Sequence, residues 1–99
     1  MYARMTCIHI KPDRVQAAID LYKKSVVPDA KKQKGFKGLL LLTDPQTGSG
    51  LSITLWTSEK AALATEESRY YQEQLVKFTD LYTLPPSREG YEVSLQVKV

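Results

Sequence analysis

The sequence has few of the residue types from which most metal and nucleophile sites are built. Among its 99 residues there is one cysteine, Cys7, and one histidine, His9. A single cysteine excludes a disulfide within the chain, which fits a reducing compartment. One histidine and one cysteine also fall short of the three or four ligands that zinc takes in proteins. The sequence therefore predicts no metal centre.

Long apolar segments are absent as well. The run of four leucines at 39–42 is far shorter than the roughly 20 apolar residues of a membrane-spanning helix. Arg4 and His9 interrupt the apolar N-terminal stretch, so we expect no signal peptide. The sequence thus predicts a cytoplasmic protein that does not bind membranes.

The excess of positive charge is small and concentrated in one part of the chain. The formal net charge is +3 and the isoelectric point is near 9.0. No arginine interleaves with these lysines, so a solvated helix end is favoured over a nucleic-acid site. The lysines concerned are Lys23, Lys24, Lys31, Lys32, Lys34 and Lys37.

Hydrophobic periodicity and turn-forming residues give the order of elements. Strands are indicated by alternating polar and apolar residues or by apolar runs rich in β-branched and aromatic residues. Helices are indicated by apolar residues that recur every three or four positions. The predicted elements are a strand at 2–11, a helix from Pro12 broken at Pro28, strands at 36–43 and 51–56, a helix at 68–82 and a strand at 91–99. Residues 1–99 are therefore expected to form one α+β domain of order β-α-β-β-α-β.

The two faces of the predicted sheet differ in what covers them. Right-handed crossovers place both helices on one face, so the other face is bare. The strand at 51–56 separates Leu51, Ile53 and Leu55 from Ser52, Thr54 and Trp56. Periodicity does not decide which set faces the helices. The leucines at 39–42 favour a sheet covered on both sides, with the apolar set on the bare face and a second copy against it.

Four stretches in order carry a family resemblance: Gly35-Phe36-Lys37-Gly38, then 56–61, then 70–74, then Tyr91-Glu92-Val93. Their order and spacing resemble the antibiotic-biosynthesis-monooxygenase-like domains of the dimeric α+β barrel superfamily, over nearly the whole chain. The resemblance implies a ferredoxin-like fold with an antiparallel four-stranded sheet. It also implies a homodimer in which two sheets pack into a barrel with the helices outside.

The same resemblance, read with the strand and helix faces, divides the candidate residues into two sets. A ligand pocket is expected beneath the helices, at Met5, Cys7, His9, Tyr22, Ser52, Thr54, Trp56 and Tyr71. The dimer interface is expected at Ile8, Ile10, Leu51, Ile53, Leu55, Val93 and Leu95.

Activities in the superfamily include oxygenation of phenols and quinols without metal or flavin, which implies no cofactor. In these phenol oxygenases the functional residues include a tryptophan on a strand, an asparagine four residues before it and a tyrosine six residues after it. Here Trp56 is kept, while Ser52 and Ala62 occupy the other two positions. The haem-degrading members need an asparagine, a tryptophan and a histidine where this chain has Met5, Thr65 and Leu75. The sequence therefore argues against haem degradation.

Two hypotheses about function remain open at this stage. The first is a cofactor-independent monooxygenase for a small phenol or quinol, with Trp56, Ser52 and His9 as candidate catalytic residues. Trp56 can stack on an aromatic ring or serve only as core, Ser52 can donate a hydrogen bond, and His9 can serve as a general base. The alternative is a non-catalytic homodimer that binds a small hydrophobic or aromatic ligand or serves as a stress-related accessory.

Two further interpretations are disfavoured by geometry. Cys7 and His9 lie two residues apart on a strand, roughly 6.5 to 7 Å, which is too far for a nucleophile–base hydrogen bond. RNA-recognition modules share the element order, but they need several exposed aromatic residues on one strand. The strand at 51–56 offers only Trp56.

Overall fold

A four-stranded antiparallel sheet forms one layer of the protein. The computed structural model describes residues 1–99. The strands are β1 (Tyr2–Ile10), β2 (Phe36–Thr43), β3 (Ser49–Trp56) and β4 (Tyr82–Glu92). They lie in the order β2-β3-β1-β4, and every neighbouring pair is antiparallel. This is the ferredoxin-like arrangement that the sequence predicted.

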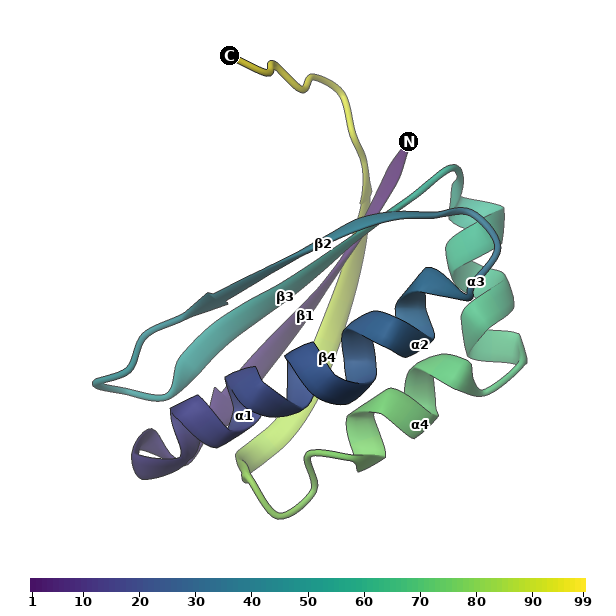
Figure 1. Ribbon diagram of the computed structural model, residues 1–99. Coiled ribbons are helices and arrows are strands. Elements are labelled where there is room, and N and C mark those ends of the chain that lie inside the picture. The colour runs from purple at the N-terminus through teal and green to yellow at the C-terminus, as the bar shows by residue number, and fades with distance from the viewer.

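The helices form the second layer, and all of them cover the same face of the sheet (Figure 1). They are α1 (Val15–Leu21), α2 (Val27–Lys31), α3 (Glu59–Glu67) and α4 (Tyr70–Val76). The predicted α+β class and β-α-β-β-α-β order are therefore confirmed. None of these helices is long and apolar enough to cross a membrane.

The first crossover is one continuous helical segment with an irregular centre. A 3₁₀ turn η1 (Pro12–Arg14) leads into α1, and a π turn η2 (Tyr22–Val26) joins α1 to α2. The Val27 amide donates to the Tyr22 carbonyl, five residues back. Proline at position 28 has no amide and crowds the preceding turn, so the wider turn accommodates it. The break predicted at Pro28 is thus replaced by a π turn just before it, of a kind often found at functional sites.

The second crossover consists of two helices where the sequence predicted one main helix at 68–82. Ser58 caps α3 by accepting a hydrogen bond from the Ala61 amide at 3.1 Å. Arg69 then has a left-handed backbone with φ of 69°, which ends α3 and redirects the chain into α4. Such a backbone is uncommon outside glycine, and no local pattern indicates it.

The fourth strand was predicted at 91–99, and that prediction was wrong. β4 occupies 82–92, and the residues after Glu92 lie beyond the sheet (Figure 1). Pro85 and Pro86 argue against a strand there when the sequence is considered alone. β4 is an edge strand, and its register against β1 shifts between Leu84 and Ser87. Prolines are tolerated at such edges and bulges because the missing amide bonds are not required there.

The helix-covered face of the sheet carries the core. Arg4 and Thr6 of β1 pair with Thr54 and Ser52 of β3, and both are buried. Every second residue of β1 from Arg4 onward therefore points toward the helices. Ile8 and Ile10, expected at a dimer interface, therefore lie under the helices at 2% exposure each. The predicted phase of β1 was off by one residue, which exchanges its two faces. The core cluster comprises Ile8, Ile10, Val15, Ala18, Tyr22, Val26, Phe78 and Leu81.

The opposite face of the sheet is open and largely apolar. Ile53 pairs with Met5 and Leu51 with Cys7, on the side away from the helices. On β2, Leu40 and Leu42 are 56% and 44% exposed. Of the two arrangements that periodicity left open, the structure adopts the one with the apolar side of β3 on the uncovered face.

Candidate functional site

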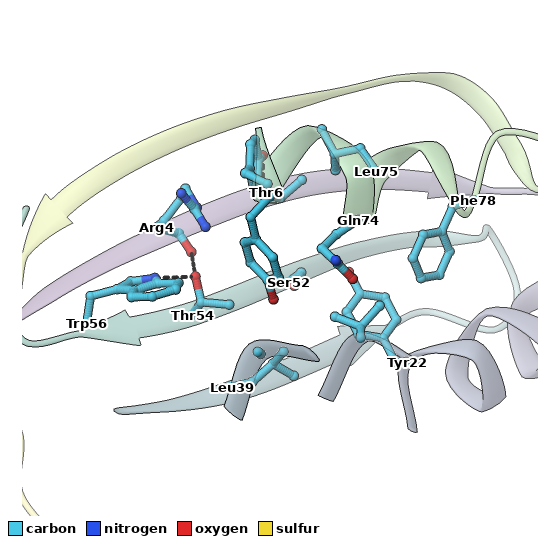
Figure 2. Close-up of a pocket in the computed structure, with 14 residues that line it drawn as sticks. Arg4, Thr6, Tyr22, Leu39, Ser52, Thr54, Trp56, Gln74, Leu75 and Phe78 are labelled. Carbon is cyan, nitrogen blue, oxygen red and sulfur yellow. Dashed lines mark hydrogen bonds between the residues drawn. The ribbon is translucent and has the colours of Figure 1, made fainter. Parts of the chain in front are cut away.

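A narrow cavity lies between the sheet and the helices (Figure 2). Its free volume is about 480 Å³ including the open mouth, but the centre of a water molecule can occupy only about 40 Å³ of it. Nine of its 14 lining residues are hydrophobic. The walls come from β1, β2 and β3 below and from the first crossover and α4 above. So small an accessible volume suits a small ligand better than a bulky one.

Arg4 is the one charged residue that lines the cavity, and it is 4% exposed. Its Nη1 donates to the Ala62 carbonyl at 3.1 Å and to the Thr65 hydroxyl at 2.9 Å. It also donates to Glu66 Oε2 at 3.1 Å. Nε is buried without a partner, and Nη2 donates no hydrogen bond. One nitrogen thus anchors the guanidinium to α3, while the other two are unused.

Two aromatic rings hold the Arg4 guanidinium. Its central carbon lies 4.1 Å from the Tyr71 ring centre and 5.3 Å from that of Trp56, within cation–π range. Burial lowers the pKa of Arg4, and the hydrogen bond to Glu66 opposes that effect. A guanidinium stays protonated in proteins, so the cavity contains a fixed positive charge.

Glu66 is shared between two arginines. Its Oε2 lies 3.1 Å from Arg4 Nη1 and its Oε1 lies 2.8 Å from Arg88 Nη2. The Glu66 side chain is 13% exposed, whereas that of Arg88 is 51% exposed. One carboxylate facing two guanidiniums leaves one positive charge uncompensated at this end of the cavity.

Trp56 forms a rigid part of the wall beside Arg4. It is 1% exposed. Its Nε1 donates to the Thr54 hydroxyl at 2.8 Å, and Phe36 packs against it edge-on with ring centres 5.6 Å apart. The indole N–H is therefore already engaged, so Trp56 offers a ligand its ring surface.

Three tyrosines line the cavity as protonated hydroxyls. Tyr71 shares a 2.8 Å hydrogen bond with Thr6, whereas the Tyr70 hydroxyl has no hydrogen-bond partner in the protein. Burial, with a smaller contribution from Asp29, raises the pKa of Tyr70 to about 12. Burial also raises the pKa of Tyr22 and Tyr71. At neutral pH all three therefore stay protonated, so each can donate a hydrogen bond and none acts as a base.

A polar cluster ties α4 to the first crossover above the cavity. Lys77 Nζ donates to the Ser25 hydroxyl at 2.7 Å and to Asp29 Oδ2 at 2.8 Å. It also donates to Gln74 Oε1 at 2.8 Å. The hydrogen bond from Lys77 is the main reason that the pKa of Asp29 lies below its usual value. These contacts fix the position of the helices that form the cavity roof.

Five of the expected pocket residues lie around this cavity. They are Tyr22, Ser52, Thr54, Trp56 and Tyr71. The three on β3 alternate along the strand, and the two tyrosines project from opposite sides of the helical layer.

The other three expected pocket residues lie elsewhere. Met5, Cys7 and His9 are on the uncovered face of β1, because they alternate with the buried Arg4 and Thr6. His9 therefore cannot act as a base in the cavity. The sheet itself separates it from Trp56 and Ser52.

Sequence reasoning missed the other lining residues, among them Arg4, Thr6, Tyr70 and Gln74. A signal for Arg4 is present, since it is the only arginine, lysine, aspartate or glutamate in β1. One regular helix over 68–82 would point Tyr70 and Tyr71 in different directions. In the structure Tyr70 and Tyr71 are the first two residues of α4, and both line the cavity.

Comparison with known proteins rests on structure alone. No family model matches the sequence, and no curated protein is similar to it. An antibiotic biosynthesis monooxygenase superposes with a TM-score of 0.73 at 14% identity, covering 96% of this chain and 100% of the other. The protein has the antibiotic-biosynthesis-monooxygenase fold.

Two other structures with this fold hold ligands. A monooxygenase from the gene ActVA-Orf6 of Streptomyces coelicolor, in complex with nanaomycin D, matches at TM-score 0.81 and 13% identity over 99% of this chain and 91% of its own. The haem degrader MhuD of Mycobacterium tuberculosis, with two haems in its active site, matches at TM-score 0.79 and 16% identity over 99% of this chain and 100% of its own. Since one fold serves both, the fold does not decide the substrate.

Proposed function

We propose that this protein binds one planar phenol or quinol in the cavity beneath its helices and oxygenates it without metal or flavin. The observation that carries the proposal is the narrow slot walled by Trp56 and three tyrosines. Support comes from the shared fold with a monooxygenase that binds nanaomycin D. The slot excludes bulk water and holds hydroxyl donors at its wall, which is the environment that such chemistry requires.

The reaction requires electrons only from the substrate. The ionised phenol transfers an electron to dioxygen, and the two radicals combine at a ring carbon to give a hydroperoxide. Loss of water from that hydroperoxide leaves a carbonyl on the ring. Overall, a phenol and one dioxygen give a quinone and one water, with the phenol oxidised and one oxygen atom reduced to water. The protein supplies position, a dry site and hydrogen bonds from Ser52 and the Tyr70 hydroxyl.

The test is oxygen consumption with a panel of naphthols and quinols, with product identified by mass spectrometry. We expect one dioxygen consumed per quinone formed, and Trp56→Phe to lower kcat/KM about tenfold by loosening the ring slot. The control is Leu63→Ala, because Leu63 is 42% exposed on α3 and does not line the cavity. If no compound is consumed faster than without protein, the oxygenase proposal is rejected.

A second candidate function is binding without catalysis. The cavity lining contains no carboxylate and no imidazole, its tyrosines stay protonated, and Ala62 stands where the related oxygenases have a tyrosine. A non-catalytic carrier of small aromatic molecules fits the same features. Calorimetric binding of a naphthol with no oxygen uptake would favour the carrier over the oxygenase.

We also propose that two copies pair through the uncovered face of the sheet. Leu40, Leu42 and Tyr91 expose 56%, 44% and 52% of their surface there, and monomeric proteins rarely leave large apolar patches in water. Leu51, Ile53 and Leu55, which the sequence placed at the interface, lie on the same face. Val93 and Leu95 follow β4, with Leu95 81% exposed. Native mass spectrometry in gentle and then denaturing conditions measures both the dimer and any releasable ligand.

A further inference from the structure

The charge at one end of the cavity is unbalanced, and the protein has left donors there unused. We propose that Arg4 binds the ligand's ring hydroxyl as its oxyanion, so that the site selects acidic phenols in ionised form. This inference rests on the proposed function, because it specifies the chemical form in which that function takes its substrate. It also assigns a role to the one charged side chain that lines the cavity.

The balance of charge around Arg4 favours an anionic ligand. Arg4 and Arg88 both contact the single carboxylate of Glu66, at 3.1 and 2.8 Å. Arg4 is 4% exposed, so water compensates little of its charge. An isolated buried charge is costly unless it is paired. A ligand oxyanion would give the two arginines a second negative partner, whereas a neutral ligand would leave them to share Glu66.

The number and position of hydrogen-bond donors also favour an anionic ligand. Of the three Arg4 nitrogens, only Nη1 makes hydrogen bonds, and all of these go to α3. Cation–π contacts with Tyr71 and Trp56 hold the guanidinium in place. The Tyr70 hydroxyl supplies a further donor without a partner in the lining of the same cavity. Preorganised donors of this kind stabilise oxyanions most strongly where water is excluded.

The cavity also lacks a base. Glu66 is occupied by two arginines, His9 lies across the sheet, and the cavity tyrosines are protonated. The phenol proton must therefore leave to solvent through the mouth of the cavity. Arg4 favours that ionisation by stabilising the anion that remains, which removes the need for a catalytic base.

The two ends of the cavity also fix the orientation of the ring. Figure 2 shows Arg4 and Trp56 at one end and Tyr22 and Phe78 at the other. A phenol would place its oxygen at the Arg4 end and its apolar edge toward Phe78. Apolar substituents at the end of the ring opposite the hydroxyl are therefore tolerated better than charged substituents at that end.

The experiment measures ionisation of a bound reporter without any turnover. 4-Nitrophenol is titrated against pH by absorbance, under nitrogen, with and without excess protein. We expect the pKa of bound nitrophenol to fall by about one unit or more, equivalent to about tenfold tighter binding of the anion than of the neutral phenol. 4-Nitroanisole, which cannot ionise, should bind at least tenfold more weakly than the nitrophenolate.

Three variants separate charge from structure. Arg4→Met should abolish the shift, and Arg88→Gln should reduce it by leaving Glu66 to Arg4 alone. Glu66→Gln should enlarge the shift, because it removes the competing carboxylate. A merely structural role predicts that all three variants weaken binding alike. Arg88 is half exposed, so its variant is expected to fold even if the Arg4 variant does not.

The outcomes for the two proposals are distinguishable. An unshifted nitrophenol, or a smaller shift in Glu66→Gln than in the wild type, overturns the role of Arg4. Binding of 4-nitrobenzoate in preference to nitrophenolate also overturns it and indicates a carboxylate site. A shifted nitrophenol without oxygen uptake for any phenol retains Arg4 and rejects the oxygenase. Undiminished oxygen uptake in Arg4→Met retains the oxygenase and rejects the role of Arg4.

Discussion

In the middle of β1 and β3, the two faces of the sheet differ in a way that reverses the usual expectation. The helix-covered face carries Arg4, Thr6 and Ser52, all buried, in the middle of β1 and β3. The uncovered face carries Leu51 and Ile53 at the neighbouring positions. An ordinary two-layer domain would place the apolar set under the helices. Here polar groups occupy part of the interior and apolar groups lie outside.

This reversal indicates that each face has a separate task. A polar group in the interior is costly unless it is hydrogen-bonded, so its retention points to a site. An apolar surface outside is tolerated if something covers it. The inner face therefore carries the proposed chemistry, and the outer face the proposed pairing. Changes on the two faces should have separable effects.

The largest effect is expected at Trp56. Trp56→Ala should lower the free energy of unfolding by about 3 to 5 kcal/mol, because a fully buried large side chain leaves a cavity. Leu40→Ala, in the dissociated protomer, should cost about 1 kcal/mol or less, since Leu40 is 56% exposed. Urea unfolding monitored by circular dichroism measures both. Equal losses at the two positions would contradict the difference between the faces.

The next largest effect concerns pairing. Leu42→Lys should weaken the proposed dimer about 100-fold, because each copy would bury a charge without a partner. Val76→Lys is the control, since Val76 is 68% exposed on α4, on the helical side. Sedimentation equilibrium gives the dissociation constants. A dimer equally stable in both variants would place the interface elsewhere.

A smaller effect is expected at the hydrogen bond between Tyr71 and Thr6. Tyr71→Phe should cost about 1 to 2 kcal/mol, because it leaves the buried Thr6 hydroxyl without its 2.8 Å partner. Thr6→Val should cost less in a protein that already carries Tyr71→Phe than it does in the wild type. A double-mutant cycle of thermal unfolding measures this coupling. Strictly additive losses would mean that the bond contributes nothing.

The smallest effect is a loss of stability at alkaline pH. The pKa of Tyr70 is raised to about 12, above the value of about 10 for an unfolded tyrosine. Between these values the unfolded chain releases a proton that the folded chain keeps, so stability falls as pH rises through this range. Tyr70→Phe should reduce the fall by less than about 1 kcal/mol at pH 11, since the side chain is partly exposed. Urea midpoints at pH 9, 10 and 11 would show the change of slope.

Much of the fold could be predicted because its signals are local. Alternation and turn residues located β2 and β3, and the rule for right-handed crossovers placed the helices on one face. The prediction of β4 failed because Pro85 and Pro86 were taken to exclude a strand, whereas a strand at the edge of a sheet tolerates proline. Edge position is a property of the assembled sheet, and residues 82–92 carry no local mark of it.

The candidate site was harder to predict because it depends on strand phase. Ser52, Thr54 and Trp56 share one side of β3, so placing Trp56 correctly placed all three. On β1 the prediction assigned the apolar isoleucines to the outer face, which moved Cys7 and His9 inward and Arg4 outward. Pairing of Thr6 with Ser52 fixes the opposite phase. That pairing is a tertiary contact between residues 46 positions apart in the sequence.

The prolines of β4 have a consequence for how copies of this chain can assemble. A strand edge with free amides and carbonyls can recruit another strand and extend a sheet indefinitely, as in fibres. Pro85 and Pro86 have no backbone amide hydrogens, and the register shift beside them makes the edge strand β4 irregular. Lateral growth at this edge is thereby blocked. The pairing proposed above uses the flat uncovered surface of the sheet instead, and it would end at a closed pair.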